Sequence, residues 1–221
     1  MTNFYSIQFL VFLLISLLGY YTVFRKKQWV CLLIASAVFY AFTGMENFVF
    51  LLLTGFSTWA GARWIARCSA ELKQIKKDKT IEKAEKDFRK VQVVRKRRIM
   101  MWGVVLLNFG LLSYIKFPEN VLGLVLPLGI SFYMFQSIGY LLDIYNEKYE
   151  PEANFARYML FVSYFPQMIQ GPINRYDAIG GQFMQEHTWN GEAATKAVYR
   201  IFYGLFKKYA IANIFIGMIA S

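Results

Sequence analysis

Long apolar runs that contain prolines, glycines and amide side chains constrain this sequence most strongly. Residues 126–175 hold two such runs, joined by a charged segment at 143–152. The residues that a lipid-facing helix avoids are Pro127, Gly129, Gln136, Pro166, Gln167, Gln170, Gly171, Pro172 and Arg175. In hydrocarbon, an unpaired backbone group or amide side chain is strongly unfavourable. We therefore expect this stretch to build the inside of a membrane-embedded site, where it faces protein or a water-filled cavity.

The remaining apolar residues also come in blocks long enough to cross a bilayer. Hydrophobic residues make up 57% of the 221 residues, whereas a soluble domain averages about 45–50%. The blocks do not alternate every second residue, as the strands of a membrane barrel do. The sequence predicts an all-α polytopic integral membrane protein with about seven membrane runs, some of them broken or re-entrant.

These runs divide the chain into four parts. Residues 1–66 hold three predicted transmembrane helices, and 67–98 form a basic helical segment on the cytoplasmic side. Residues 99–175 hold further transmembrane helices together with the unusual residues, and 176–221 combine an interfacial segment with a last membrane run. The individual runs are predicted at 4–24, 28–43, 48–66, 99–115, 121–145, 155–174 and 198–220.

The net charge of +11 could indicate a nucleic-acid-binding protein, but the placement of the charge argues against this. Two segments, Arg25–Lys27 and Arg63–Arg98, hold 17 of the 25 Lys and Arg residues. Both flank apolar runs, as positive-inside signals do. Basic residues follow the first run and do not precede it, so we expect an uncleaved span with the N-terminus outside. The segment 67–98 is either a solvated loop that sets this topology or a helix that binds lipid or a partner on the inner leaflet.

The cysteines and the histidine of the sequence do not form a recognisable disulfide pair or metal site. Cys31 and Cys68 are the only cysteines, and we predict no disulfide. No Cys/His metal spacing and no phosphate-binding loop is present, so no metal site and no bound cofactor is expected. His187 is the single histidine. An imidazole can act as a general base, but the polar sequence around it is typical of a surface loop.

Three polar residues are the candidates for contact with substrate or for lining a tunnel: Gln136, Gln170 and Arg175. Gln136 could equally tie two helices together. Arg175 could bind a phosphate or carboxylate, or could extend to the membrane interface. Asp143 and Tyr145 lie near a predicted helix end, where a capping or interfacial role is expected. The residues expected to shape the backbone are Pro127, Gly129, Pro166, Gly171 and Pro172.

The last run contains two adjacent lysines, Lys207 and Lys208. One interpretation is that residues 196–208 lie amphipathically in the interface and that the helix begins near Tyr209. The other is that the two lysines line a polar cavity.

Several short words in the sequence resemble the membrane-bound O-acyltransferase (MBOAT) family, and in particular its bacterial, alginate O-acetylase-like branch. The words are LPLGISF (126–132), FQ (135–136), YLLDIY (140–145), YFPQ (164–167), GPINRY (171–176) and, more weakly, GLFKK (204–208). The resemblance implies a ring of helices around a tunnel in the bacterial inner or plasma membrane. Through it an acyl group, acetyl by expectation, reaches a hydroxyl of a cell-surface or exported polysaccharide or wall polymer.

The resemblance also implies the other participants. Acetyl-CoA or a carrier-bound acyl group serves as donor, an extracellular acetyl-transfer protein is a possible partner, and nucleic acid is not involved. Family members are longer, and their catalytic histidine lies on a helix well after the GPINR word, so His187 does not match it. We therefore expect this chain to be the N-terminal half of such an enzyme, inactive alone. The alternatives are a transporter or flippase subunit that uses the broken helices as a gate, and an inactive fragment.

Overall fold

The computed structural model of the chain describes residues 6–79, 82–116, 129–168 and 171–208. All the regular elements in these ranges are helices. They are α1 (Ile7–Tyr21), α2 (Gln28–Thr43), α3 (Met45–Lys77), α4 (Lys83–Lys116), α5 (Ile130–Tyr145), α6 (Phe155–Ser163), α7 (Phe165–Met168), α8 (Tyr176–Phe183) and α9 (Gly191–Phe206). The chain divides into two compact units between Gln185 and Glu186. The predicted all-α class is thus confirmed for the described residues.

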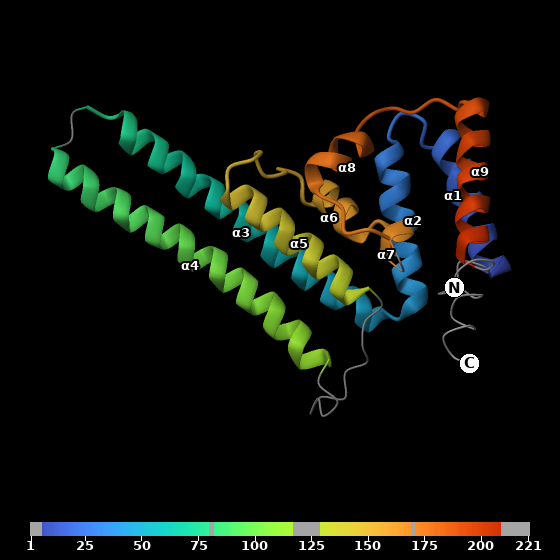
Figure 1. The fold of residues 1–221 in the computed structure, drawn as a ribbon, viewed down its shortest axis with the longest axis horizontal. Coiled ribbons are helices and arrows are strands. Elements are labelled where there is room, and N and C mark those ends of the chain that lie inside the picture. Colours follow the sequence, from blue (N-terminus) through green and yellow to red (C-terminus); the bar gives the residue numbers. More distant parts are fainter. Residues whose placement is uncertain (1–5, 80–81, 117–128, 169–170, 209–221) are drawn as a thin grey trace. The chain divides into compact units, whose positions relative to one another are not determined.

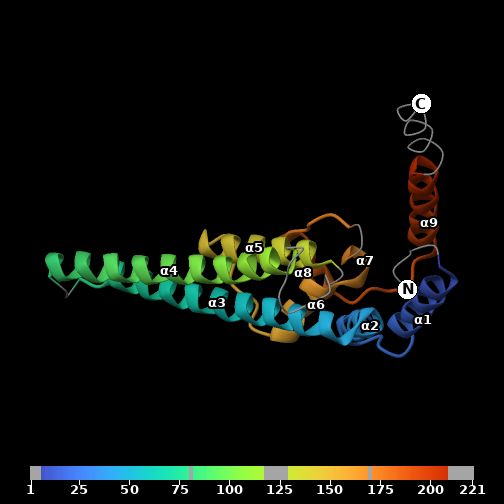
Figure 2. The same ribbon diagram turned by 90° about the horizontal axis from the view of Figure 1, so that it is seen from below.

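Helices α3 and α4 form a long hairpin and pack side by side along their length (Figures 1 and 2). The helical segments Phe48–Lys77 and Lys83–Lys116 are long and apolar enough to cross a membrane. A helix of 33 residues is about 50 Å long, well beyond the ~30 Å of bilayer hydrocarbon. The hairpin can therefore cross a bilayer and still project from it at one end.

The basic helical segment predicted at 67–98 consists of the ends of α3 and α4, with the break between Lys77 and Lys83. No glycine or proline lies between Ala62 and Glu82, so nothing stops α3 where its apolar part ends. The helix ends instead at Asp78, which is extended.

The first two helices are apolar but short. Helix α2 has the predicted bounds of 28–43, and α1 is shorter than the predicted run of 4–24. Their 15 and 16 residues reach about 22–24 Å, less than the usual hydrocarbon thickness. Two of the described helices are thus membrane-spanning by length and composition, and a total of seven runs stays a prediction.

The core of the first unit surrounds α5. This helix contacts α3, α4 and α6 and buries residues on several of its sides, among them Tyr133, Tyr140 and Asp143. Rings from neighbouring elements pack against one another in the same core, including Phe39 and Phe165. Aromatic contacts of this kind add to the free energy of apolar burial. Helix α5 is therefore fixed in place by several elements that are distant in sequence.

The predicted run 155–174 is broken, as its prolines and glycines indicated. Asn154 caps α6 by accepting hydrogen bonds from the backbone N–H groups of Ala156 and Arg157. The helix ends after nine residues, Tyr164 interrupts it, and the single turn α7 follows. Pro166 lies in the first turn of α7, the part of a helix where proline fits. A non-helical stretch, 171–175, then leads to α8.

Helix α9 forms the described part of the second unit. It is capped by Asn190, which accepts from the N–H groups of Glu192 and Ala193, and none of its residues is buried. Large apolar side chains such as Ile201 and Phe202 are exposed. The helix begins before the predicted segment 196–208 and includes most of it. The helix that we predicted to begin near Tyr209 lies outside the described residues.

Candidate functional site

Gln136 is a buried amide at the centre of α5, 5% exposed. Its Nε2 donates to the backbone carbonyl of Phe161 in α6 at 3.1 Å and to Oε1 of Gln167 in α7 at 3.5 Å. Phe161 lies two residues before the end of α6, where backbone carbonyls lack intrahelical donors. The structure thus shows the helix-tying role for Gln136, and its place in a tunnel wall stays a prediction.

Asp143 is the centre of a polar junction at the end of α5. It is 5% exposed, and its Oδ1 lies 2.5 Å from Nζ of Lys148 and 3.4 Å from Nη1 of Arg175. The hydroxyl of Tyr149 donates to its Oδ2 at 3.5 Å. The carboxylate joins α5, the loop 146–154 and the segment that precedes α8. We expected a capping or interfacial role for Asp143 from the sequence, whereas the structure shows a buried carboxylate with two cationic partners.

Arg175 reaches this junction from the non-helical end of the broken run. Its side chain is 63% exposed, and its ion pair with Asp143 holds one end of the guanidinium. A guanidinium has five N–H donors, so most of its donors face away from this contact. The side chain is therefore held in place and still able to bind an anionic group.

Tyr140, Glu152 and Tyr176 form a second set of contacts beside Asp143. The hydroxyl of Tyr140 accepts from the N–H of Glu152 at 2.8 Å, and the hydroxyl of Tyr176 donates to Oε2 of Glu152 at 2.7 Å. The rings of Tyr140 and Tyr176 pack edge to face with centroids 5.2 Å apart. Burial raises the pKa of Tyr176 well above its ordinary value, so it stays a hydrogen-bond donor. Sequence reasoning did not single out these residues, although both tyrosines lie in the family-like words.

Two of the residues expected to shape the backbone, Gly129 and Gly171, lie in close contact with backbone atoms of α7. Gly129 has a φ of 72°, and a Cβ there would lie 2.8 Å from the carbonyl oxygen of Met168. A Cβ on Gly171 would lie 2.5 Å from Cα of Gln167. Glycine at 129 lets the start of α5 approach the end of α7 closely, and glycine at 171 lets the chain pass close to the backbone of α7 itself. Pro172 is exposed, and Pro127 and Gln170 lie outside the described residues.

His187 belongs to the second unit, where it is exposed in the segment between α8 and α9. Within the part of the chain that the structure describes, no group of three or more His, Cys, Asp or Glu side chains could hold a metal ion.

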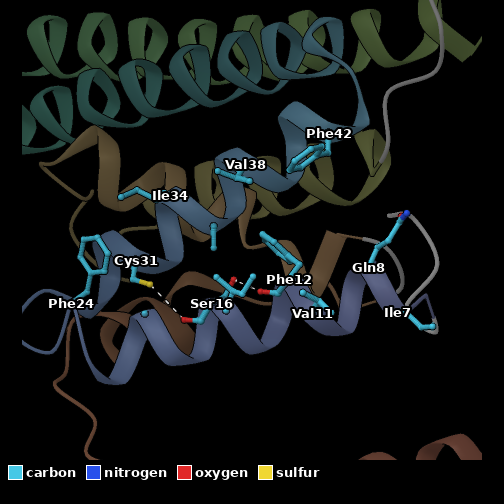
Figure 3. Close-up of a pocket in the computed structure, with 13 residues that line it drawn as sticks. Ile7, Gln8, Val11, Phe12, Ser16, Phe24, Cys31, Ile34, Val38 and Phe42 are labelled. Carbon is cyan, nitrogen blue, oxygen red and sulfur yellow. Dashed lines mark hydrogen bonds between the residues drawn. The ribbon is translucent and has the colours of Figure 1, made fainter.

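An apolar groove lies between α1 and α2, with a volume of about 660 Å³ (Figure 3). Val11, Ile34 and Val38 line it, and Cys31 closes one end, where its Sγ donates to the carbonyl of Ser16 at 3.7 Å. The groove holds no charged side chain, so it offers neither a base nor an anion-binding group. The polar junction around Asp143 is the better candidate for chemistry.

Comparisons with known proteins give a consistent set of relatives. The chain is 30% identical over 195 residues to the probable alginate O-acetylase AlgI of Azotobacter vinelandii, and 31% identical over 210 residues to its counterpart in Pseudomonas aeruginosa. It is also 33% identical over 134 residues to a peptidoglycan O-acetyltransferase of Helicobacter pylori. No family model matches the chain, and no solved structure matches it significantly.

These alignments cover most of this chain in two cases, but only a minor part of each relative. The two alginate O-acetylase alignments cover 88% and 92% of this chain, but 38% of each relative. The match to the Helicobacter protein covers 49% of the chain and 25% of that relative. The resemblance seen in the sequence words is therefore confirmed: the chain is a distant homologue of the alginate O-acetylases and resembles the amino-terminal portion of a membrane-bound O-acyltransferase.

Proposed function

We propose that this chain is part of a membrane O-acyltransferase that acetylates hydroxyl groups of a cell-surface or exported polysaccharide. The main support for this proposal is that most of the chain is similar to proteins named as O-acetylases. The relatives' names share O-acetyl transfer but differ in the polymer, which is alginate in one case and peptidoglycan in the other. The reaction class is therefore better supported than any particular acceptor.

The proposal includes a location in the bacterial inner or plasma membrane, which two observations support. The α3–α4 hairpin contains the two described helices that are long and apolar enough to span, and the named relatives are bacterial proteins. By the positive-inside rule, the basic end of the hairpin faces the cytoplasm and the N-terminus lies outside. In this orientation an acetyl-CoA or carrier-bound donor would approach from the cytoplasm, and the polymer, with any partner protein, from outside.

The polar junction suggests how the chain would contribute to the reaction. We assign Arg175 to bind an anionic group of donor or acceptor, because its guanidinium is exposed and suited to bidentate bonds with phosphate or carboxylate. Asp143 and Gln136 would act as positioning residues. Asp143 orients Arg175, and Gln136 holds α5 against the broken run.

Acyl transfer to a hydroxyl needs two further conditions. A base must take the hydroxyl proton while the oxygen attacks the thioester carbonyl carbon, after which the thiolate leaves and is protonated. Water must also be excluded, or the acyl group would be hydrolysed. We assign the base to none of the described residues. Packed helices such as α3, α5 and α6 would supply the exclusion of water.

The test is deletion of the gene in its native host, followed by measurement of alkali-labile acetate on the exported and wall polysaccharides. We expect deletion to remove acetate from one polymer and the wild-type gene to restore it. Arg175→Ala should lower the acetate about tenfold or more, the loss expected for a charge-assisted contact. Arg175→Lys should restore part of it.

Arg95→Ala provides the matched control, because Arg95 is an exposed arginine of α4 outside the junction. This variant should restore acetylation fully. Unchanged polymer acetate after deletion would refute the proposal. If uptake or export of a solute were lost instead, a transporter function would be favoured.

A further inference from the structure

A second cavity, separate from the apolar groove, lies between α3 and the loop that joins α5 to α6, and it shares Lys148 and Tyr149 with the polar junction. Its volume is about 650 Å³. Six charged side chains line it, four of them basic: Arg63, Arg67, Lys73, Glu147, Lys148 and Glu150. Small and apolar residues, including Ala66, Ala70 and Ile144, form the rest of the wall. The cavity thus combines an excess of positive charge with an apolar side.

Most of the basic groups in this cavity already have partners. Arg63 donates from Nη1 to the carbonyl of Ala153 at 2.6 Å and stacks over the ring of Trp59. Lys73 pairs with Glu147 at 3.1 Å, and Lys148 with Asp143 at 2.5 Å. The contacts of Arg63 and Lys73 hold the loop against α3, and that of Lys148 holds it against α5.

Arg67 is the exception. It is exposed, and within the described ranges neither a hydrogen bond nor an ion pair is formed by its guanidinium. Lys73, six residues further along α3, uses one of its three N–H donors on Glu147 and is 64% exposed. Arg67 and Lys73 therefore offer a bidentate guanidinium and an ammonium to a ligand. This donor set suits a phosphate.

The position of the cavity along α3 favours a lipid as the source of that phosphate. Residues 48–62 of α3 contain no charged side chain, and Arg63 is the first charged residue after them. If the apolar part of α3 lies in hydrocarbon, its first charged turns lie at the level of the phospholipid headgroups. The apolar wall of the cavity then fits the glycerol and upper acyl part of the same molecule.

We propose that this cavity binds the phosphate headgroup of an anionic phospholipid, with Arg67 and Lys73 as its ligands. The inference requires the membrane location but no acyl-transfer activity. The proposal assigns a specific lipid site to this cavity. The other basic residues of the hairpin would attract an anionic leaflet only by long-range electrostatics. A soluble phosphate compound offers the same chemistry and is the competing source.

The experiment measures lipid binding to the purified full chain in detergent, by native mass spectrometry during titration with phosphatidylglycerol. Arg67→Gln should weaken binding about tenfold, the loss expected for one charge-assisted contact. Arg67→Lys should retain part of the affinity. Arg67→Gln combined with Lys73→Gln should weaken binding further.

Arg95→Gln is the matched control, since Arg95 is exposed on α4, outside the cavity lining, and the change removes the same charge. It should change the affinity less than about twofold. Equal losses in Arg67→Gln and Arg95→Gln would overturn the proposal, because they would show diffuse attraction. Thermal unfolding of Arg67→Gln should match wild type, which separates loss of the site from loss of the fold.

Inorganic pyrophosphate distinguishes the two sources of phosphate. If the lipid is the ligand, pyrophosphate should compete only weakly with bound phosphatidylglycerol. If pyrophosphate binds the lipid-free protein in an Arg67-dependent way and phosphatidylglycerol does not bind, the lipid proposal is refuted. Because the readout is binding, these results stand independently of whether the host polymer loses its acetate.

Discussion

The α3–α4 hairpin and the α5–α8 region both contain long apolar stretches, but their helices differ in continuity. The hairpin consists of two uninterrupted helices of 33 and 34 residues. The other region, between residues 130 and 183, contains four helices of 16, 9, 4 and 8 residues. The difference follows from the prolines and glycines, which interrupt the second region around 164–175 and are absent from the basic half of α3.

The two regions also pair their buried polar groups differently. In the hairpin, Asn108 donates to the carbonyl of Val104 within its own helix at 2.9 Å, with longer contacts to α3. In the broken region, Gln136 donates to the carbonyl of Phe161, 25 residues away, and Asp143 pairs with Arg175, 32 residues away, as well as with the nearby Lys148. Interrupted helices leave backbone and side-chain groups that distant elements must satisfy. The broken region should therefore be sensitive at its junctions, and the following predictions test this.

The largest effect is expected at the start of α5. Gly129→Ala forces a residue with a Cβ into a left-handed conformation and places that Cβ against the backbone of Met168. We expect a loss of about 2–4 kcal/mol in the free energy of unfolding, measured by thermal unfolding in detergent. Gly139→Ala, in the same helix but with no atom within 4 Å of its Cβ, should be neutral or stabilising by up to about 1 kcal/mol. Equal effects would show that the close approach of α5 and α7 is unimportant.

A smaller effect is expected from Asp143→Asn, which removes the charge shared by Lys148 and Arg175. Breaking a buried ion pair costs about 3–5 kcal/mol, but both cations are partly exposed, so we expect about 1–3 kcal/mol. The control is Asp87→Asn, which breaks the exposed Asp87–Lys90 pair of the hairpin and should leave the unfolding temperature nearly unchanged. A larger drop in unfolding temperature for Asp87→Asn than for Asp143→Asn would contradict the expectation that the broken region is the more sensitive one.

The smallest effect is expected at the ion pairs that join the α3–α4 hairpin to the α5–α8 region. Glu147 lies in the loop after α5 and pairs with Lys73 of α3 and Arg97 of α4. The hydrogen bond from Lys73 and the charges of Lys73 and Arg97 lower its pKa below the ordinary 4.5. A lowered pKa stabilises the fold above the unfolded pKa, and this stabilisation is lost as the pH falls through the folded pKa.

Glu147→Gln isolates this contribution, because all other groups titrate in both proteins. We expect wild type to unfold at a slightly higher temperature than the variant at neutral pH, and the two to converge in acid, below the ordinary pKa. Unfolding followed by circular dichroism across this pH range measures the difference. A gap between the two proteins that persists in acid would rule out the ion pairs as its cause.

The amino-acid sequence by itself determined the helical class, the bounds of α2 and the interruption of the run that begins at Phe155. These features depend on long apolar blocks and on prolines and glycines, which act within a few residues of their own position. The sequence also contained the words that pointed to the O-acyltransferases, since a match of word order needs no structure.

Only the tertiary structure decided how the polar residues are used. It joined Asp143 to Arg175, turned Gln136 toward the end of α6, and carried α3 without a break into the basic segment. It also gathered Arg67 and Lys73 beside a loop more than seventy residues away in the chain. Such contacts depend on which distant elements pack together to bury apolar surface and satisfy interrupted backbone, and no local pattern in the sequence encodes that choice.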